Sequence, residues 1–223
     1  MSQLPDLKIP SHVGKTADEI VAINYFDSVG YLFRCMAWLD YFSRARTFSS
    51  LLYAGAEGRQ GIECLLFEEL VISTGANLSV SDYRRCVNDR ISFIKTIDRL
   101  SPNYTLLRRF TRIVASLEPA VPKLIDWNLK ALMRDWGTLS QYLHWVGARP
   151  LTTDKPKWLE EAHSKMLATV EPIWINITSG RRGVLHPKDM HPTAKEIWER
   201  FKTGEVDEKR AKFQLEFLRP LGR

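Results

Sequence analysis

The chain has 223 residues, 44% of them hydrophobic, and a formal net charge of +6, which predicts a globular protein with a sizeable core. No secretory signal is recognisable in the polar residues 1–15, and the most apolar stretch, residues 31–42, is too short to span a bilayer, so we expect a cytoplasmic protein with no membrane contact. Three widely spaced cysteines, Cys35, Cys64 and Cys86, argue against a disulfide framework and a C-x-x-C metal site and predict reduced core residues.

The first predicted helix follows a polar tail of residues 1–15. The segment Thr16–Glu19 has the pattern of a capping box, which favours a helix start, and Gly30 is a candidate interruption. Beyond it, apolar residues recur every three or four positions, and we expect them in the core: Val29, Leu32, Phe33, Met36, Leu39 and Phe42.

A second long helix is predicted from Thr47 to Thr74, with Gly75 at its end. Three glycines lie inside it: Gly55, Gly58 and Gly61. Glycine costs a helix about 1 kcal/mol relative to alanine, so these positions favour close contact with another helix over a ligand site. Arg59 and Glu63 are one turn apart, which predicts an ion pair.

Two helices are expected next, one over residues 82–100 and one over residues 103–117, separated by Ser101 and Pro102. Residues 83–134 hold eleven Lys and Arg against four Asp and Glu, a net charge of +7, while the rest of the chain carries −1. Such a block is typical of a polyanion partner, and an ordinary solvated basic helix pair is the alternative. The candidate nucleic-acid-binding residues here are Arg84, Arg85, Arg108, Arg109 and Arg112.

A fifth helix is predicted to open at Pro122 and to end near Gly147, and a sixth to open at Pro156 and to kink or break at Pro172. Toward the C-terminus, a second capping box at Thr193–Glu196 predicts a helix that ends at Gly204. A charged amphipathic helix over residues 206–218 follows. Its apolar residues are Phe213, Leu215, Phe217 and Leu218.

Helical spacing of apolar residues continues almost throughout, and no segment has the alternation of a strand. The sequence therefore predicts an all-α protein. We expect a helical bundle over residues 16–190 and a helical extension over residues 191–223.

The stretch Ser179–His186 combines Arg181 and Arg182 with His186 at short spacing. An arginine remains charged, and a histidine titrates near neutral pH, so the pair offers the two groups that metal-free phosphodiester cleavage requires. Gly180, Gly183 and Pro187 disfavour a regular helix here. A turn that exposes backbone N–H groups beside two arginines is equally suited to binding phosphate.

Arg181 followed by four residues and His186 resembles the R-x(4 to 6)-H motif of the HEPN superfamily, and the run Ala54–Glu63 is similar to the second helix of several HEPN-like families. These are helical-bundle proteins, many of them metal-independent ribonucleases of toxin–antitoxin, abortive-infection and CRISPR defence systems. The resemblance implies a homodimer whose two copies of Arg181 and His186 line one cleft, RNA as substrate, and an antitoxin or other protein partner. It implies that His186 acts as general base or acid, that Arg181, helped by Arg182, stabilises the phosphoryl charge, and that no metal or cofactor takes part.

Three other interpretations stay open. A noncatalytic helical module that binds nucleic acid or a protein is the main alternative to the ribonuclease. Ser140 and His144, one turn apart, are a candidate second polar site, and a structural histidine with its hydrogen bonds satisfied is the favoured alternative. A metal site formed by His186, Asp189 and His191 is a weaker hypothesis, because no further ligand is near in sequence.

Overall fold

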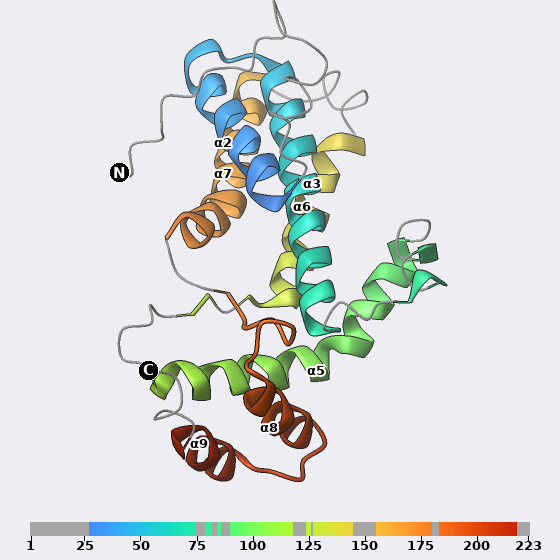
Figure 1. Cartoon of the computed structure of the whole chain (residues 1–223). Coiled ribbons are helices and arrows are strands. Elements are labelled where there is room, and N and C mark those ends of the chain that lie inside the picture. Colours follow the sequence, from blue (N-terminus) through green and yellow to red (C-terminus); the bar gives the residue numbers. More distant parts are fainter. Residues whose placement is uncertain are drawn as a thin grey trace, which may run out of the picture. The chain divides into compact units, whose positions relative to one another are not determined.

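A computed structural model of the chain describes residues 27–74, 79–81, 84–85, 90–117, 124–125, 127–144, 155–179 and 183–217. Their regular structure is helical and includes no strand, which confirms the predicted all-α class. The helices are α2 (Ser28–Ala45), α3 (Phe48–Ser73), α5 (Arg90–Leu117), α6 (Leu129–His144), α7 (Lys155–Thr178), α8 (Pro192–Lys202) and α9 (Glu208–Phe217) (Figure 1). No helix in the described part of the chain is both long and apolar enough to cross a bilayer.

The chain divides into two compact units, and the division falls within α3. Unit 1 comprises Met1–Leu66 and Asn128–Thr178, and unit 2 comprises Phe67–Trp127 and Ser179–Arg223. The grouping differs from the predicted boundary at residue 190, because α8 and α9 belong with α5 in unit 2. The predicted tail and the Thr16–Glu19 capping box lie outside the described residues.

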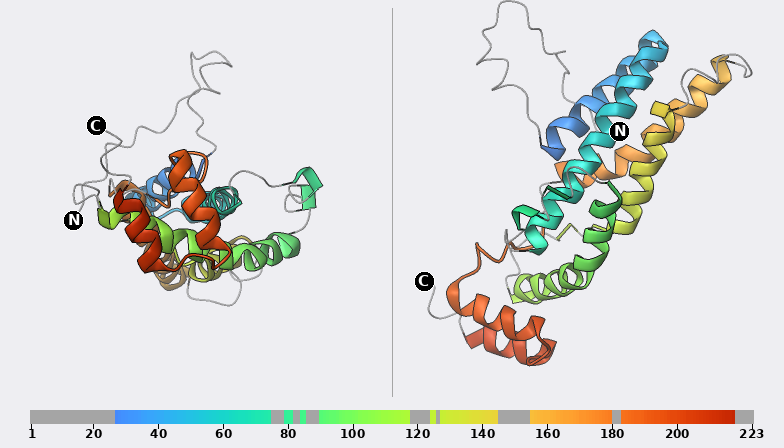
Figure 2. Two further views of the ribbon diagram at one scale, coloured as in Figure 1. Left: turned by 60° about the horizontal axis from the view of Figure 1, so that its bottom comes forward. Right: turned by 90° about the vertical axis from the view of Figure 1, so that its right-hand side faces the viewer.

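Unit 1 is a helical bundle in which α7 packs on α2 and on α6 (Figures 1 and 2). Helix α2 begins after Asp27, whose side chain accepts a hydrogen bond from the backbone N–H of Gly30 over 2.7 Å. Gly30 therefore lies in the first turn and does not interrupt the helix. Most of the predicted core positions of α2 are buried, including Leu32, Leu39 and Phe42, but Val29 is 44% exposed, so its assignment to the core was wrong.

Two glycines of α3 allow α2 to approach closely. A Cβ atom added to Gly58 would lie 2.8 Å from the Sγ atom of Cys35, and one added to Gly61 would lie 2.7 Å from the Cγ atom of Leu32. Real Cβ atoms do not come this close to their neighbours, so no larger residue fits without displacement of α2. The prediction of close helix contact is confirmed, and so are the bounds of this helix to within one residue.

In unit 2, α5 packs on α8 and α9, which also pack on each other (Figures 1 and 2). The ring centroid of Phe110 lies 5.5 Å from that of Trp198 and 5.7 Å from that of Phe201, and all three rings are buried. Gly204 has a positive φ of 79° and lies just after α8, which confirms the predicted end of this helix. On α9, Leu215 is buried, whereas Phe213 and Phe217 are exposed and contact each other edge to face.

Pro102 does not separate two helices, so this prediction was wrong. Helix α5 continues through it and changes direction along its length (Figures 1 and 2). A proline inside a helix removes one hydrogen bond and costs about 3 kcal/mol, and a bend relieves its clash with the preceding turn. Buried side chains on both sides, Ile97 and Tyr104 among them, hold the helix in place. Pro172 likewise lies inside an unbroken α7.

Two predicted helix starts were also wrong. Ile125 is buried but not helical, and α6 begins only after Asn128, whose side-chain oxygen accepts a hydrogen bond from the N–H of Ala131 over 3.1 Å. Helix α8 begins at Pro192, not after Thr193, because the Nδ1 atom of His191 caps it by accepting from the N–H of Thr193 over 3.4 Å. The side-chain cap sets the first residue of each helix, later than the sequence pattern predicts for α6 and earlier for α8.

Candidate nucleic-acid interface

His186 lies in the non-helical segment 183–191, which precedes α8 in unit 2. Three side chains anchor this segment in the core: Val184, Pro187 and Met190. The backbone N–H of Leu185 donates to the hydroxyl of Thr111 on α5 over 3.1 Å. Because its neighbours are fixed on both sides, the half-buried imidazole of His186 is held at the surface of unit 2.

The ring of His186 has a defined hydrogen-bond partner. The backbone N–H of Lys188 donates to its Nδ1 atom over 3.0 Å, and the N–H of Asp189 donates to the carbonyl oxygen of His186 over 2.9 Å. With Nδ1 accepting, the neutral imidazole carries its proton on Nε2. His186 therefore offers an N–H donor to an incoming oxygen, and a proton transfer in either direction requires the contact with Lys188 to open.

Arg181 and Arg182 lie outside the described residues. The segment from Gly183 to His186 is not helical, as the glycines and Pro187 led us to expect. The proposed pairing of Arg181 with His186, and the dimer cleft that the resemblance implies, therefore stay predictions.

The five arginines predicted to bind nucleic acid differ in their surroundings. Arg84, Arg85 and Arg112 are exposed on unit 2. Arg108 is partly buried, its Nη1 atom donates to the carbonyl oxygen of Trp127 over 3.4 Å, and its guanidinium lies 5.7 Å from the ring centroid of Tyr104. These contacts give Arg108 a structural role within unit 2.

Arg109 is exposed, but it connects α5 with α9. Its Nε atom lies 2.7 Å from a carboxylate oxygen of Glu208, and its guanidinium lies 5.9 Å from the ring centroid of Phe201. Since about half of each charged side chain remains in contact with solvent, this ion pair contributes little to stability, and nucleic-acid phosphate can compete for Arg109.

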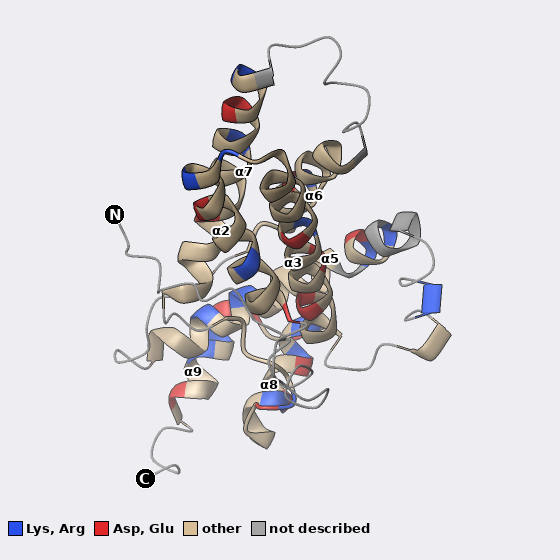
Figure 3. Ribbon diagram, turned by 90° about the horizontal axis from the view of Figure 1, so that it is seen from above, with Lys and Arg blue, Asp and Glu red and all other residues tan. Residues whose placement is uncertain are grey.

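The structure divides the positive charge of the chain very unevenly. Counted over the full sequence ranges, unit 2 holds 20 Lys and Arg against 14 Asp and Glu, whereas unit 1 holds 12 of each, so the whole net charge of +6 belongs to unit 2. The basic block of residues 83–134 extends past this division, since Lys130 and Arg134 lie in unit 1. Figure 3 marks the Lys and Arg positions along the helices. The C-terminal residues of unit 2, which the sequence block did not include, supply part of this excess.

A buried acid lies in the same unit. Glu69, in the last part of α3, is 4% exposed, and burial raises its pKa to about 7. A hydrogen bond from Tyr104 favours the charged carboxylate, the neighbouring charge of Glu68 opposes it, and the charge of Arg108 favours it again. Burial is the largest of these effects, so the protonated form of Glu69 persists to near-neutral pH.

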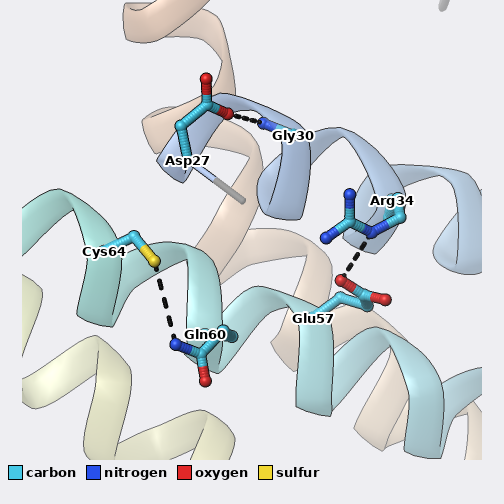
Figure 4. Close-up of polar contacts among 6 residues, drawn as sticks. All are labelled: Asp27, Gly30, Arg34, Glu57, Gln60 and Cys64. Carbon is cyan, nitrogen blue, oxygen red and sulfur yellow. Dashed lines mark hydrogen bonds and ion pairs between the residues drawn. The ribbon is translucent and has the colours of Figure 1, made fainter. Parts of the chain in front are cut away.

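In unit 1, the polar residues of the Ala54–Glu63 run bind one another and the adjacent helices. The Nε atom of Arg34 on α2 lies 2.9 Å from a carboxylate oxygen of Glu57 on α3 (Figure 4). The predicted ion pair between Arg59 and Glu63 is present at 3.9 Å, and Glu63 also accepts from the indole N–H of Trp136 on α6 over 3.3 Å. These contacts connect three helices and give the run a structural function.

The weaker candidates gain no support as sites. The hydroxyl of Ser140 donates to the carbonyl oxygen of Trp136 within α6, as a helical serine commonly does. Among the described residues, no group of three or more His, Cys, Asp and Glu could hold a metal, so His186, Asp189 and His191 do not form the alternative metal site. Cys35 is buried, which raises the pKa of its thiol and keeps it unreactive. The Sγ atom of Cys64 accepts a hydrogen bond from the side-chain N–H of Gln60 over 3.8 Å, and Cys86 lies outside the described residues.

No protein-family model matches the chain, and neither does any curated protein or solved structure. The resemblance to the HEPN superfamily therefore remains a prediction that depends on Arg181, His186 and the Ala54–Glu63 run.

Proposed function

We propose that the chain binds RNA through the surface of unit 2. The observation that carries this proposal is the charge division: the unit that contains His186 also holds the entire net charge of +6, and unit 1 is neutral. Positively charged side chains bind nucleic acid because each phosphate that they neutralise releases condensed counterions. The exposed pair Arg84 and Arg85 and the exposed Arg112 supply such side chains.

Removing two exposed arginines from unit 2 should weaken RNA binding more than removing two lysines from unit 1. We expect Arg84→Ala with Arg85→Ala to lower the affinity for labelled single-stranded RNA about tenfold, and to reduce the slope of log K against log salt by about 1.4 between about 50 and 200 mM salt. Fluorescence anisotropy measures both quantities.

The matched control is Lys157→Ala with Lys165→Ala on α7 of unit 1, which removes the same charge from exposed positions. This variant should bind as the wild type does. Equal losses in the two double variants would show that only total charge matters and would refute an interface on unit 2.

Metal-independent cleavage of the bound RNA by Arg181 and His186 is the second candidate function. It is favoured by the position of His186, which is half-buried on the cationic unit and has its neighbours fixed. In such a reaction the 2′-hydroxyl attacks the adjacent phosphorus, the 5′ oxygen leaves, and the proton of the hydroxyl is transferred to the leaving oxygen by way of His186. Arg181 would stabilise the negative charge on the phosphoryl oxygens.

Cleavage should persist in EDTA, should require a 2′-hydroxyl at the cut position, and should fall at least about a hundredfold in Arg181→Ala and in His186→Ala. Gel separation of a labelled RNA measures the rate. His191→Asn is the control, because it removes an exposed imidazole from the same unit and asparagine can still cap α8. A wild type that leaves RNA intact, or rates that are the same in all variants, excludes the enzyme and leaves the binding function standing.

A further inference from the structure

Unit 2 contains a pocket of about 280 Å³ next to the segment that carries His186. Its walls come from the end of α3, from α5, from the turn after His186 and from α8. Three lysines line it: Lys188, Lys195 and Lys202. The sequence did not single these lysines out, because they are spread over fifteen residues, and the turn before α8 brings Lys188 to the pocket that two lysines of α8 also line.

The charge of the pocket exceeds what its own carboxylate can neutralise. Glu199 also lines it, and its carboxylate accepts a hydrogen bond from the ammonium group of Lys202. Lys188 and Lys195 are both exposed, and the ion pairs of the described residues include neither of them. The pocket therefore carries a net charge of about +2, which a dianion would balance.

The remaining lining limits what can enter. The hydroxyl of Thr74 donates to carbonyl oxygens at the end of α3, over 3.0 Å to Val71 and 3.1 Å to Leu70, so its proton is already used. The indole of Trp198 is 2% exposed and already packs on Phe110 within the core, which leaves little of its face for stacking on a base. A volume of about 280 Å³ is at the small end for ligand sites, so a compact charged group fits better than a stretch of nucleotide chain.

We propose that this pocket binds a phosphomonoester dianion, the phosphate at one end of an RNA strand. An internal phosphodiester carries one negative charge, whereas a terminal phosphate carries nearly two at neutral pH, which matches the charge of the pocket. The backbone N–H of Lys188 donates to the ring of His186, so one of the three pocket lysines and the imidazole belong to one short turn. That the phosphate belongs to RNA rests on the proposed function. That the pocket binds a dianion rests only on its lysines and does not depend on RNA binding.

The test compares three otherwise identical short RNAs, with a 5′-phosphate, a 3′-phosphate or no terminal phosphate, and adds inorganic phosphate alone as a probe. Calorimetry measures affinity, and NMR follows the indole N–H signal of Trp198. One of the phosphorylated RNAs should bind the wild type about tenfold more tightly than the unphosphorylated RNA. Inorganic phosphate should shift the Trp198 signal and remove that difference.

Lys195→Ala should abolish the preference for the phosphorylated end, and Lys195→Arg should keep most of it. Lys212→Ala is the matched control, because it removes one exposed lysine of the same unit that does not line the pocket, and the preference should survive. Circular dichroism of each variant shows whether it is folded.

Two results separate this proposal from the proposed function. A wild type that responds to inorganic phosphate at Trp198 but does not bind RNA keeps the pocket and refutes the RNA-binding function. The second result is a wild type that binds RNA equally well with and without a terminal phosphate and shows no change in the Trp198 signal with inorganic phosphate. That result would refute phosphate binding in the pocket and would be compatible with RNA binding by unit 2.

Discussion

Gly61→Ala should destabilise the protein by about 1–3 kcal/mol, although alanine is the better helix former. The added methyl group would lie 2.7 Å from the Cγ atom and 3.1 Å from the backbone N atom of Leu32. Leu32 is fully buried in α2, so neither its side chain nor its backbone can move away cheaply. The gain of up to about 1 kcal/mol from helix propensity is smaller than this cost. Urea unfolding followed by circular dichroism measures the difference.

Gly137→Ala on α6 is the matched control. No atom lies within 4 Å of the Cβ position there, so only the helix propensity changes, and the free energy of unfolding should rise by about 0.5–1 kcal/mol. Opposite signs for the two substitutions support the close contact between α2 and α3. A Gly61→Ala variant as stable as Gly137→Ala would mean that the two helices are further apart.

The second large effect is the pH dependence of stability caused by Glu69. Its pKa is raised to about 7 in the folded protein, so the folded state binds this proton more tightly than the unfolded state does. Glu69 therefore contributes to the free energy of unfolding at low pH, by about 3 kcal/mol at most. This contribution is fully present below the unfolded pKa of about 4.5 and is lost as the pH rises to about 7.

Glu69→Gln should remove this part of the pH dependence, because glutamine keeps the shape of the protonated acid. At about pH 8 the variant should be more stable than the wild type, and at about pH 5 the two should be similar. Urea unfolding at both pH values gives the four free energies. Glu68→Gln, a change at the more accessible neighbouring position, should keep most of the dependence. If Glu69→Gln instead destabilises the protein equally at both pH values, the buried acid is charged in the folded state.

Local patterns in the sequence account for most of the helices. The three-or-four spacing of apolar residues predicted α3 and α9 closely and most of the buried positions of α2, because a helix in a bundle must bury one stripe of side chains. The errors occur where a single local signal competes with packing. Pro102 is a strong helix breaker in isolation, yet buried side chains on either side keep α5 continuous. Ile125 fits the apolar spacing of α6, yet Asn128 caps the helix after it.

The site was harder to predict, because its parts come from distant segments. A histidine near two arginines was visible in the sequence, and the structure holds this histidine half-buried on unit 2. Two hydrogen bonds position it: the N–H of Leu185 donates to the hydroxyl of Thr111, and the N–H of Lys188 donates to the imidazole itself. Neither could be inferred from the sequence, because both depend on how this segment folds and packs on α5. Counting charges along the sequence also does not reveal that the guanidinium of Arg108 donates a hydrogen bond to the carbonyl oxygen of Trp127. Grouping by units, in contrast, assigns all of the net charge to one of them.

The most direct test of RNA binding by unit 2 is ultraviolet crosslinking of the full chain to single-stranded RNA, followed by mass spectrometry of the crosslinked peptides. The crosslinks should lie within residues 67–127 and 179–223 and should decrease in the variant with Arg84→Ala and Arg85→Ala. Crosslinks confined to residues 1–66 and 128–178, at any salt concentration that allows binding, would contradict the assignment of RNA binding to unit 2.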